Sequence, residues 1–231
     1  MSSSIAENLA RVIDRIRSAE FRAGMPAESV ALVGVTKNRT VEEIEEAVRA
    51  GLTDIGENRY QEAAEKLPGL KLSVNRHFIG HLQRNKARHV LGLFDMIQSV
   101  DSGRLARTLN QHVAAAGLRP KVLLQVNTSG ESTKFGAAPE SCDEMLEVIS
   151  GLEQLELVGL MTLGPLTGDT AAIRKSFALL RKLYEDYAGR PVGNSRMEVL
   201  SMGMSADFEI AIAEGANMVR VGTAIFGPRT Q

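Results

Sequence analysis

Residues 30–51 read VALVGVTKNRTVEEIEEAVRAG, a short apolar run followed by a polar loop and then by a helical pattern. A lysine, Lys37, stands just after the point where a buried strand should end. Thr40 and Glu43 have the spacing of a capping box at a helix start, and Gly51 is typical of a helix end. The stretch therefore predicts one unit made of a strand, a loop and a helix.

The same unit recurs along the chain. The predicted strands are VALVGV (30–35), TDIGE (53–57), HFIG (77–80), MIQSV (96–100), KVLLQVN (121–127), LELVGLM (155–161), MEVLSMG (197–203) and NMVRVGT (217–223). Strands that alternate with single helices pair in parallel through right-handed crossovers. Eight such units in 231 residues are what a closed barrel requires.

An open, doubly wound sheet is the alternative architecture. It normally carries a Gly-rich phosphate turn after its first strand, and GVTKNRT is not such a turn. We therefore predict the α/β class and a (β/α)8 TIM barrel, with residues 1–231 forming a single domain. An extra amphipathic helix precedes the barrel. Its apolar positions are Ile5, Leu9, Val12, Ile13 and Ile16, with Ser2 to Ser4 as a cap and AGMP (23–26) as the stop.

The composition is that of an ordinary globular protein, with 44% hydrophobic and 24% charged residues. Lys plus Arg (27) nearly balance Asp plus Glu (28), so we expect neither nucleic acid nor a membrane surface as a partner. The single cysteine, Cys142, excludes an intramolecular disulfide framework and suits a reducing compartment. No signal-peptide pattern or membrane span is evident, and we expect a cytoplasmic protein.

Chemistry in such a barrel belongs at the carboxyl ends of the strands, where polar residues collect in this sequence. Lys37 shares the strand alternation of Ala31, Val33 and Val35, so it is predicted to continue an inward-facing row. A lysine held in a partly desolvated barrel mouth has a lowered pKa, and its amine can form a Schiff base with an aldehyde. A solvated lysine just past a strand is the alternative.

The last two strands end in turns that suit an anion. Ser201, Gly203 and Ser205 lie in a turn that is predicted to open a helix, where free backbone N–H groups favour a negative charge. Gly222 and Thr223 repeat this pattern one strand later. Phosphate sites in these barrels often follow strands seven and eight. A simple helix cap would explain Ser205 but not two adjacent turns of this kind.

Arg220 lies between Val219 and Val221 in a predicted buried strand. A guanidinium there must meet a carboxylate, a carbonyl or a ligand atom. An ion pair with Glu57 or Glu198 is one possibility. The other is that Arg220 donates a hydrogen bond to the ring nitrogen of a bound heterocycle.

The stretch HFIGHLQRNKARH (77–89) is basic and rich in histidine. Few aromatic residues accompany it, so a solvated helix start is a better interpretation than nucleic-acid binding. His77 and His81 are four residues apart, but no third ligand completes a metal motif.

Taken together, these residues resemble the pyridoxal phosphate homeostasis family, also called the YggS or proline synthetase co-transcribed homologue family. The resemblance is carried by LVGVTKNRT, IGENRYQE, HFIGHLQRNK, SVDS, GLMTLGP and LSMGMSADFEIAIAEGANMVRVGTAIFG. It implies a barrel similar to the N-terminal domain of alanine racemase, with pyridoxal 5'-phosphate (PLP) at its mouth.

The resemblance also implies a role for each matching residue. Lys37 would hold PLP as an internal aldimine, and Arg220 would face the pyridine nitrogen. The residues implied in phosphate binding are Ser201, Ser205, Gly222 and Thr223, and those implied in lining the ring are Asn58 and Met202. The implied family role is intracellular PLP (vitamin B6) homeostasis, in which the protein supplies PLP to apo-enzymes. We expect a monomer or a weak dimer.

An amino-acid racemase of weak or narrow activity is the alternative to a carrier. Arginine only donates hydrogen bonds, so Arg220 disfavours the protonated ring that carbanion chemistry needs. A racemase also needs a second acid–base group opposite the lysine, and Tyr60 is the tyrosine that keeps this option open. A lysine-dependent aldolase is a weaker interpretation, since it does not explain Arg220. We therefore expect a carrier or regulator more than a catalyst.

Overall fold

The computed structural model describes residues 4–131, 133–190, 192–193 and 195–228. In this part of the chain, β-strands alternate with helices in the predicted order. The strands are β1 (Ala31–Val35), β2 (Asp54–Glu57), β3 (Asn75–Phe78), β4 (Met96–Val100), β5 (Lys121–Gln125), β6 (Glu156–Met161), β7 (Val199–Ser201) and β8 (Met218–Val221). The α-helices are α1 (Ile5–Arg22), α2 (Val41–Arg49), α3 (Tyr60–Lys66), α4 (Ala87–Val90), α5 (Gly103–Ala116), α6 (Cys142–Ser150), α7 (Thr170–Ala188), α8 (Phe208–Ala213) and α9 (Thr223–Phe226).

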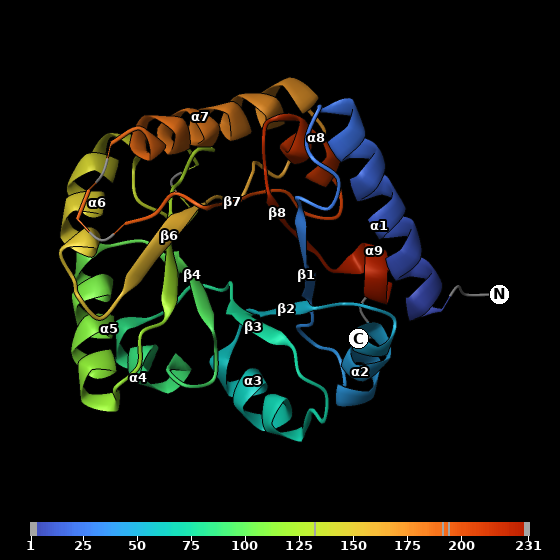
Figure 1. The fold of residues 1–231 in the computed structure, drawn as a ribbon, viewed down its shortest axis with the longest axis horizontal. Helices are drawn as coiled ribbons and strands as arrows, with labels where there is room; N and C mark the ends of the chain where they lie inside the picture. Colours follow the sequence, from blue (N-terminus) through green and yellow to red (C-terminus); the bar gives the residue numbers. More distant parts are fainter. Residues whose placement is uncertain (1–3, 132, 191, 194, 229–231) are drawn as a thin grey trace.

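The strands form a closed barrel in the order β1 to β8, and every pairing is parallel. Closure comes from β1 and β8, in which Val33 is the partner of Arg220 and Gly34 is the partner of Val221. Figure 1 shows the helices as a ring around the strands, with α1 packed beside α8 and α9. The predicted (β/α)8 barrel with an additional N-terminal helix is confirmed.

Local signals in the sequence set the helix ends as expected. Ser4 caps α1 in a capping box with Glu7, whereas Ser2 and Ser3 lie outside the described residues. Thr40 and Glu43 form the predicted capping box at α2. These bonds satisfy backbone N–H groups that have no partner inside a helix.

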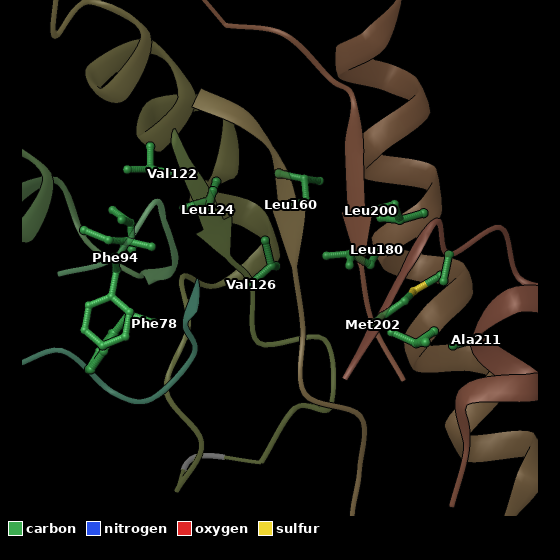
Figure 2. Close-up of a cluster of buried hydrophobic side chains, with 14 of the residues drawn as sticks. Phe78, Phe94, Val122, Leu124, Val126, Leu160, Leu180, Leu200, Met202 and Ala211 are labelled. Atoms are coloured by element: carbon green, nitrogen blue, oxygen red, sulfur yellow. The ribbon is translucent and has the colours of Figure 1, made fainter. Parts of the chain in front are cut away.

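Two apolar layers hold the barrel together. The inner layer fills the barrel and contains Val33, Met96, Leu123, Val158, Met161 and Met218. The larger outer layer lies between the strands and the helices, and Figure 2 shows part of it, including Phe78, Leu124, Leu160, Leu180 and Met202. No helix in the described ranges is long and apolar enough to cross a membrane.

Candidate functional site

Lys37 lies in the turn that directly follows β1, and it is half-buried. Ala31 and Val33 of β1 belong to or pack against the inner layer, and β1 leads directly into the turn that holds Lys37 at the carboxyl end of the barrel. A Cβ on Gly222 would lie 3.2 Å from the Val35 Cβ, so the turn after β8 lies beside the end of β1. The closure of the barrel thus brings Lys37, Arg220 and Gly222 to one mouth.

The Lys37 turn is held from outside the barrel by Lys66 of α3. The Lys66 ammonium donates to the Thr36 carbonyl oxygen at 2.7 Å and to carboxylate oxygens of Glu57 and Glu62, also at 2.7 Å each. The Thr36 hydroxyl donates to Glu57, and the Asn38 N–H donates to Glu62. The backbone on both sides of Lys37 is therefore fixed to α3.

Glu57 is unusual within this group because it has no exposed surface. Burial raises the pKa of its carboxyl group, while hydrogen bonds from Lys66 and Thr36 oppose that shift. Its second oxygen, Oε2, has no partner among the described residues. A buried carboxylate of this kind depends on its lysine for compensation.

Arg220 is 2% exposed, so its guanidinium must find partners inside the protein. Nη1 donates to the Ser201 hydroxyl, and Nη2 donates to the Thr162 carbonyl oxygen at 2.7 Å. Burial lowers the pKa of Arg220 to about 10, and the negative charge of Asp207 opposes that shift. Arg220 therefore stays charged at neutral pH.

The alternative of an ion pair between Arg220 and Glu57 or Glu198 is wrong. Glu57 faces α3 on the outside of the barrel, where it pairs with Lys66, and Glu198 pairs with Arg196 at 3.5 Å. The expectation that Arg220 meets a carbonyl group is met by Thr162.

The turns after β7 and β8 meet at Ser205. The Ser205 hydroxyl oxygen accepts from the N–H of Gly222 at 3.2 Å and from the N–H of Ala224 at 3.4 Å. Thr223 lies between these two residues and is exposed. This cluster of N–H and O–H donors is the part of the mouth that can receive an anion.

The helix expected to open at Ser205 begins later. α8 starts at Phe208, and Asp207, which precedes it, brings a carboxylate to that end and accepts the Met204 N–H. Asp207 therefore places a negative side chain at the N-terminus of α8, which is unfavourable for an anion at that helix end. The N–H groups of Gly222 and Ala224, which donate to Ser205, lie one turn away at the end of β8.

Two predicted site residues lie elsewhere than expected. The Ser201 hydroxyl is inside the barrel, with no exposed surface, and it donates to Gln98 at 2.7 Å while accepting from Arg220. Met202 is fully buried in the outer layer near Leu180, facing α7 and α8 rather than the mouth (Figure 2). Its predicted role in lining a ring is wrong, because successive strand residues face opposite sides and Ser201 already faces inward.

Asn58 follows β2 and is half-buried at the mouth. Its side-chain oxygen is buried and has no partner within the described ranges. A Cβ on Gly80 would lie 2.0 Å from the Asn58 carbonyl oxygen, so the glycine allows the two turns to touch. Asn58 thus offers an acceptor for a hydroxyl or N–H group of a ligand.

The tyrosines lie on the outside of the barrel. The Tyr60 ring packs against the outer layer and stacks on His89 with 4.8 Å between ring centroids. The Tyr184 hydroxyl donates to the Met197 carbonyl oxygen, and Tyr187 is buried on α7. In the described part of the chain, therefore, no tyrosine faces Lys37 across the mouth. No group of His, Cys, Asp and Glu suited to a metal is found there either.

Sequence reasoning missed Lys66 and the polar residues inside the barrel, above all Gln98. Lys66 and Gln98 each contact residues that are distant in the sequence, so local motifs do not reveal them. For Gln98, strand alternation is the signal that was available. Gln98 is two residues after Met96 and shares its inward row.

Comparison with known proteins gives this arrangement a family. Residues 7–230 match the family model of the alanine racemase N-terminal domain. The pyridoxal phosphate homeostasis protein of Pseudomonas aeruginosa is 44% identical over 229 residues, covering 98% of this chain and 96% of that protein. The structure of PipY from Synechococcus elongatus with PLP bound is 38% identical, with a TM-score of 0.83, and covers 97% of this chain and 100% of that one.

Alanine racemase from Clostridium difficile is similar in fold alone. It is 19% identical with a TM-score of 0.73, covering 97% of this chain and 57% of that one. The identity and near-complete coverage of the curated relatives settle the family: this chain belongs to the pyridoxal phosphate homeostasis proteins.

Proposed function

We propose that this protein binds PLP at the barrel mouth, with Lys37 as its covalent anchor, and that it stores the cofactor for PLP-dependent apo-enzymes. The observation that carries the proposal is the buried Arg220 beside the Lys37 turn, held by Ser201 and Thr162. The family name and the PLP-bound PipY structure support the same cofactor.

The mouth fits each part of this cofactor. A phosphate bound beside Thr223 would take over the N–H groups of Gly222 and Ala224 that donate to Ser205, and it would leave the Ser205 hydroxyl as a third donor. The unpartnered side-chain oxygen of Asn58 is an acceptor for a ring hydroxyl. Two Arg220 nitrogens contact protein atoms, and a guanidinium has five N–H groups, so it has donors left for a ring nitrogen.

The same residues favour storage over catalysis. PLP supplies an aldehyde that reacts with amines and a ring that can accept electrons. The Arg220 guanidinium donates its hydrogen bonds, so it disfavours a protonated ring and weakens the electron-accepting capacity. The tyrosines of the described chain lie outside the barrel, which leaves none of them to act as a second acid–base group for a racemase.

We also place the protein in the cytoplasm. The support is that Cys142 is the single cysteine, which allows no intramolecular disulfide and suits a reducing compartment.

Substitution of Lys37 tests the covalent anchor. Wild type, Lys37→Ala and Lys121→Ala are incubated with PLP, reduced with borohydride, digested and analysed by mass spectrometry. Lys121 is an exposed residue at the opposite end of the barrel and serves as the control. We expect a reduced pyridoxyl group on the Lys37 peptide of wild type and Lys121→Ala, and its absence in Lys37→Ala. A wild-type protein that takes up no PLP contradicts the proposed function.

A second measurement separates storage from racemase activity. Amino acids are added to the PLP-loaded protein in deuterated water, and loss of the α-hydrogen is followed by NMR. We expect no exchange beyond that of free PLP. Rapid exchange that depends on Lys37 favours the racemase.

A further inference from the structure

A chain of buried polar side chains crosses the inside of the barrel from the mouth to the opposite end. The Ser201 hydroxyl contacts Arg220 and lies 2.7 Å from Gln98 Oε1. Gln98 Nε2 is 2.9 Å from His77 Nδ1, and His77 Nε2 is 2.9 Å from Asp54 Oδ1. The chain uses residues from β8, β7, β4, β3 and β2 in turn.

Most of this row of polar side chains lies in an apolar part of the molecule, and its far end, at His77 and Asp54, borders a pocket. Gln98 and Ser201 have no exposed surface, and His77 is 3% exposed. The inner layer around them consists of Val33, Met96, Leu123 and other apolar side chains. Each buried polar atom here must therefore find a hydrogen-bond partner inside the protein.

The chemistry of the groups fixes the direction of the hydrogen bonds. A guanidinium only donates, so the Ser201 oxygen accepts from Arg220 and the Ser201 proton goes to Gln98 Oε1. The Gln98 amide must then present its NH2 group to His77 Nδ1, with Met218 sulfur 3.2 Å from the same nitrogen. His77 consequently carries its proton on Nε2 and donates it to Asp54.

We propose that Gln98 is a positioning residue for Arg220, and that His77 and Asp54 fix the orientation of the Gln98 amide. The side chains at the amino-terminal end of the barrel thereby hold the arginine that faces the ligand at its mouth. If the Gln98 amide turned over, its NH2 group would face Ser201, and the Ser201 proton would lose its acceptor. The role of Arg220 toward a ligand rests on the proposed PLP binding, whereas the direction of the chain does not.

The wild-type protein alone tests the direction. Nitrogen-15 NMR of the labelled, cofactor-free protein reports which ring nitrogen of His77 is protonated, with a His77→Gln variant to assign the signal. We expect a proton on Nε2 and none on Nδ1 at neutral pH. A proton on Nδ1 would overturn the proposal whether or not the protein binds PLP.

Substitutions at Gln98 test the positioning. Gln98→Leu removes the acceptor of the Ser201 proton, whereas Gln98→Glu keeps an acceptor there and places a second one against His77 Nδ1. The control is Met96→Leu, two residues earlier on the same inward row and in the same inner layer. We expect distinct, slowly exchanging Arg220 Nη–H signals in wild type, Gln98→Glu and Met96→Leu, and averaged signals in Gln98→Leu.

The cofactor gives a second readout. A buried hydrogen bond changes binding by about 1–2 kcal/mol, so Gln98→Leu should bind PLP about tenfold more weakly and with a displaced absorption maximum. Gln98→Glu should restore the wild-type affinity. The proposal fails if Gln98→Leu gives the same Arg220 signals as Met96→Leu.

If Gln98→Leu does not fold, Ser201→Ala takes its place. The same averaged Arg220 signals are expected, and unchanged signals would overturn the proposal. If wild type binds no PLP, the proposed function fails, and the NMR signals still decide the positioning.

Discussion

Lys66 holds the Lys37 turn from outside the barrel, through its bonds to Thr36 and Glu57. Its side chain is 10% exposed, and that of Glu57 is 1% exposed, so the pair is buried. Removing one partner of a buried pair leaves the other charge without compensation.

We expect Lys66→Met to lower the free energy of unfolding by about 3 kcal/mol, measured by urea denaturation. Arg181→Met is the matched control, because Arg181 pairs with Glu185 on the surface of α7, with side chains 46% and 58% exposed. Exposed pairs contribute below about 1 kcal/mol. Equal losses in the two variants would show that the Glu57 carboxylate does not need its lysine.

Asp54 links the buried polar chain to stability at acid pH. Burial alone would raise its pKa, but hydrogen bonds from His77, Thr53 and Asn75 outweigh burial, and the pKa lies below the ordinary 3.8. A carboxyl group with a lowered pKa in the folded protein adds stability above its ordinary pKa, and this stability is lost as pH falls through the folded value.

Asp54→Asn should therefore be less stable than wild type at neutral pH, and the difference should shrink on acidification through and below pH 3.8. Urea midpoints at a series of pH values measure this. A difference that stays constant with pH would mean that Asp54 contributes through packing rather than through its charge.

At the scale of elements, the turn between β7 and α8 is shaped by Gly203. Its φ is +94°, a left-handed conformation, and an added Cβ would lie 2.6 Å from the Ala211 Cβ and 2.9 Å from the Phe208 Cα. The Gly203 carbonyl also accepts the Arg220 N–H at 3.0 Å. In this turn, Gly203 contacts both α8 and β8, and Ser205 follows it two residues later.

We expect Gly203→Ala to lower the free energy of unfolding by about 2 kcal/mol and to weaken phosphate binding, since Ser205 would move. Gly168→Ala is the control, because a Cβ at Gly168 meets nothing within 4 Å. Thermal unfolding and titration with inorganic phosphate measure the two effects. If both variants behave like wild type, the turn tolerates a Cβ at Gly203 and the close contacts do not restrict it.

Strand alternation decides which of the predicted residues face the inside of the barrel. It places Arg220 on an inward row, and it would have assigned Met202, which follows the inward-facing Ser201, to the outer layer. The helix after β7 was placed too early because Ser205 resembles a cap, whereas α8 begins only at Phe208. The residue types in the connection between a strand and a helix do not show at which residue the turn ends and the helix begins.

For the whole molecule, the periodic pattern of apolar runs was sufficient to predict the closed barrel. The strand positions agree because each run must be buried between the inner and outer layers. The partners of Arg220 could not be predicted in the same way. They come from β7 and from Thr162, the residue that follows β6, and which side chains meet inside a barrel depends on strand tilt and register.

The pairing of β1 with β8 has a consequence for how the protein is made. Lys37 follows the first strand of the barrel, while Arg220 and Gly222 belong to the last strand and the turn after it. A nascent chain on the ribosome thus exposes Lys37, the proposed anchor, long before the groups that would orient a ligand exist. The mouth is assembled only when the final strand has been released and the barrel has closed. Loading is therefore an event in the life of finished molecules, and synthesis and cofactor capture are separated in time.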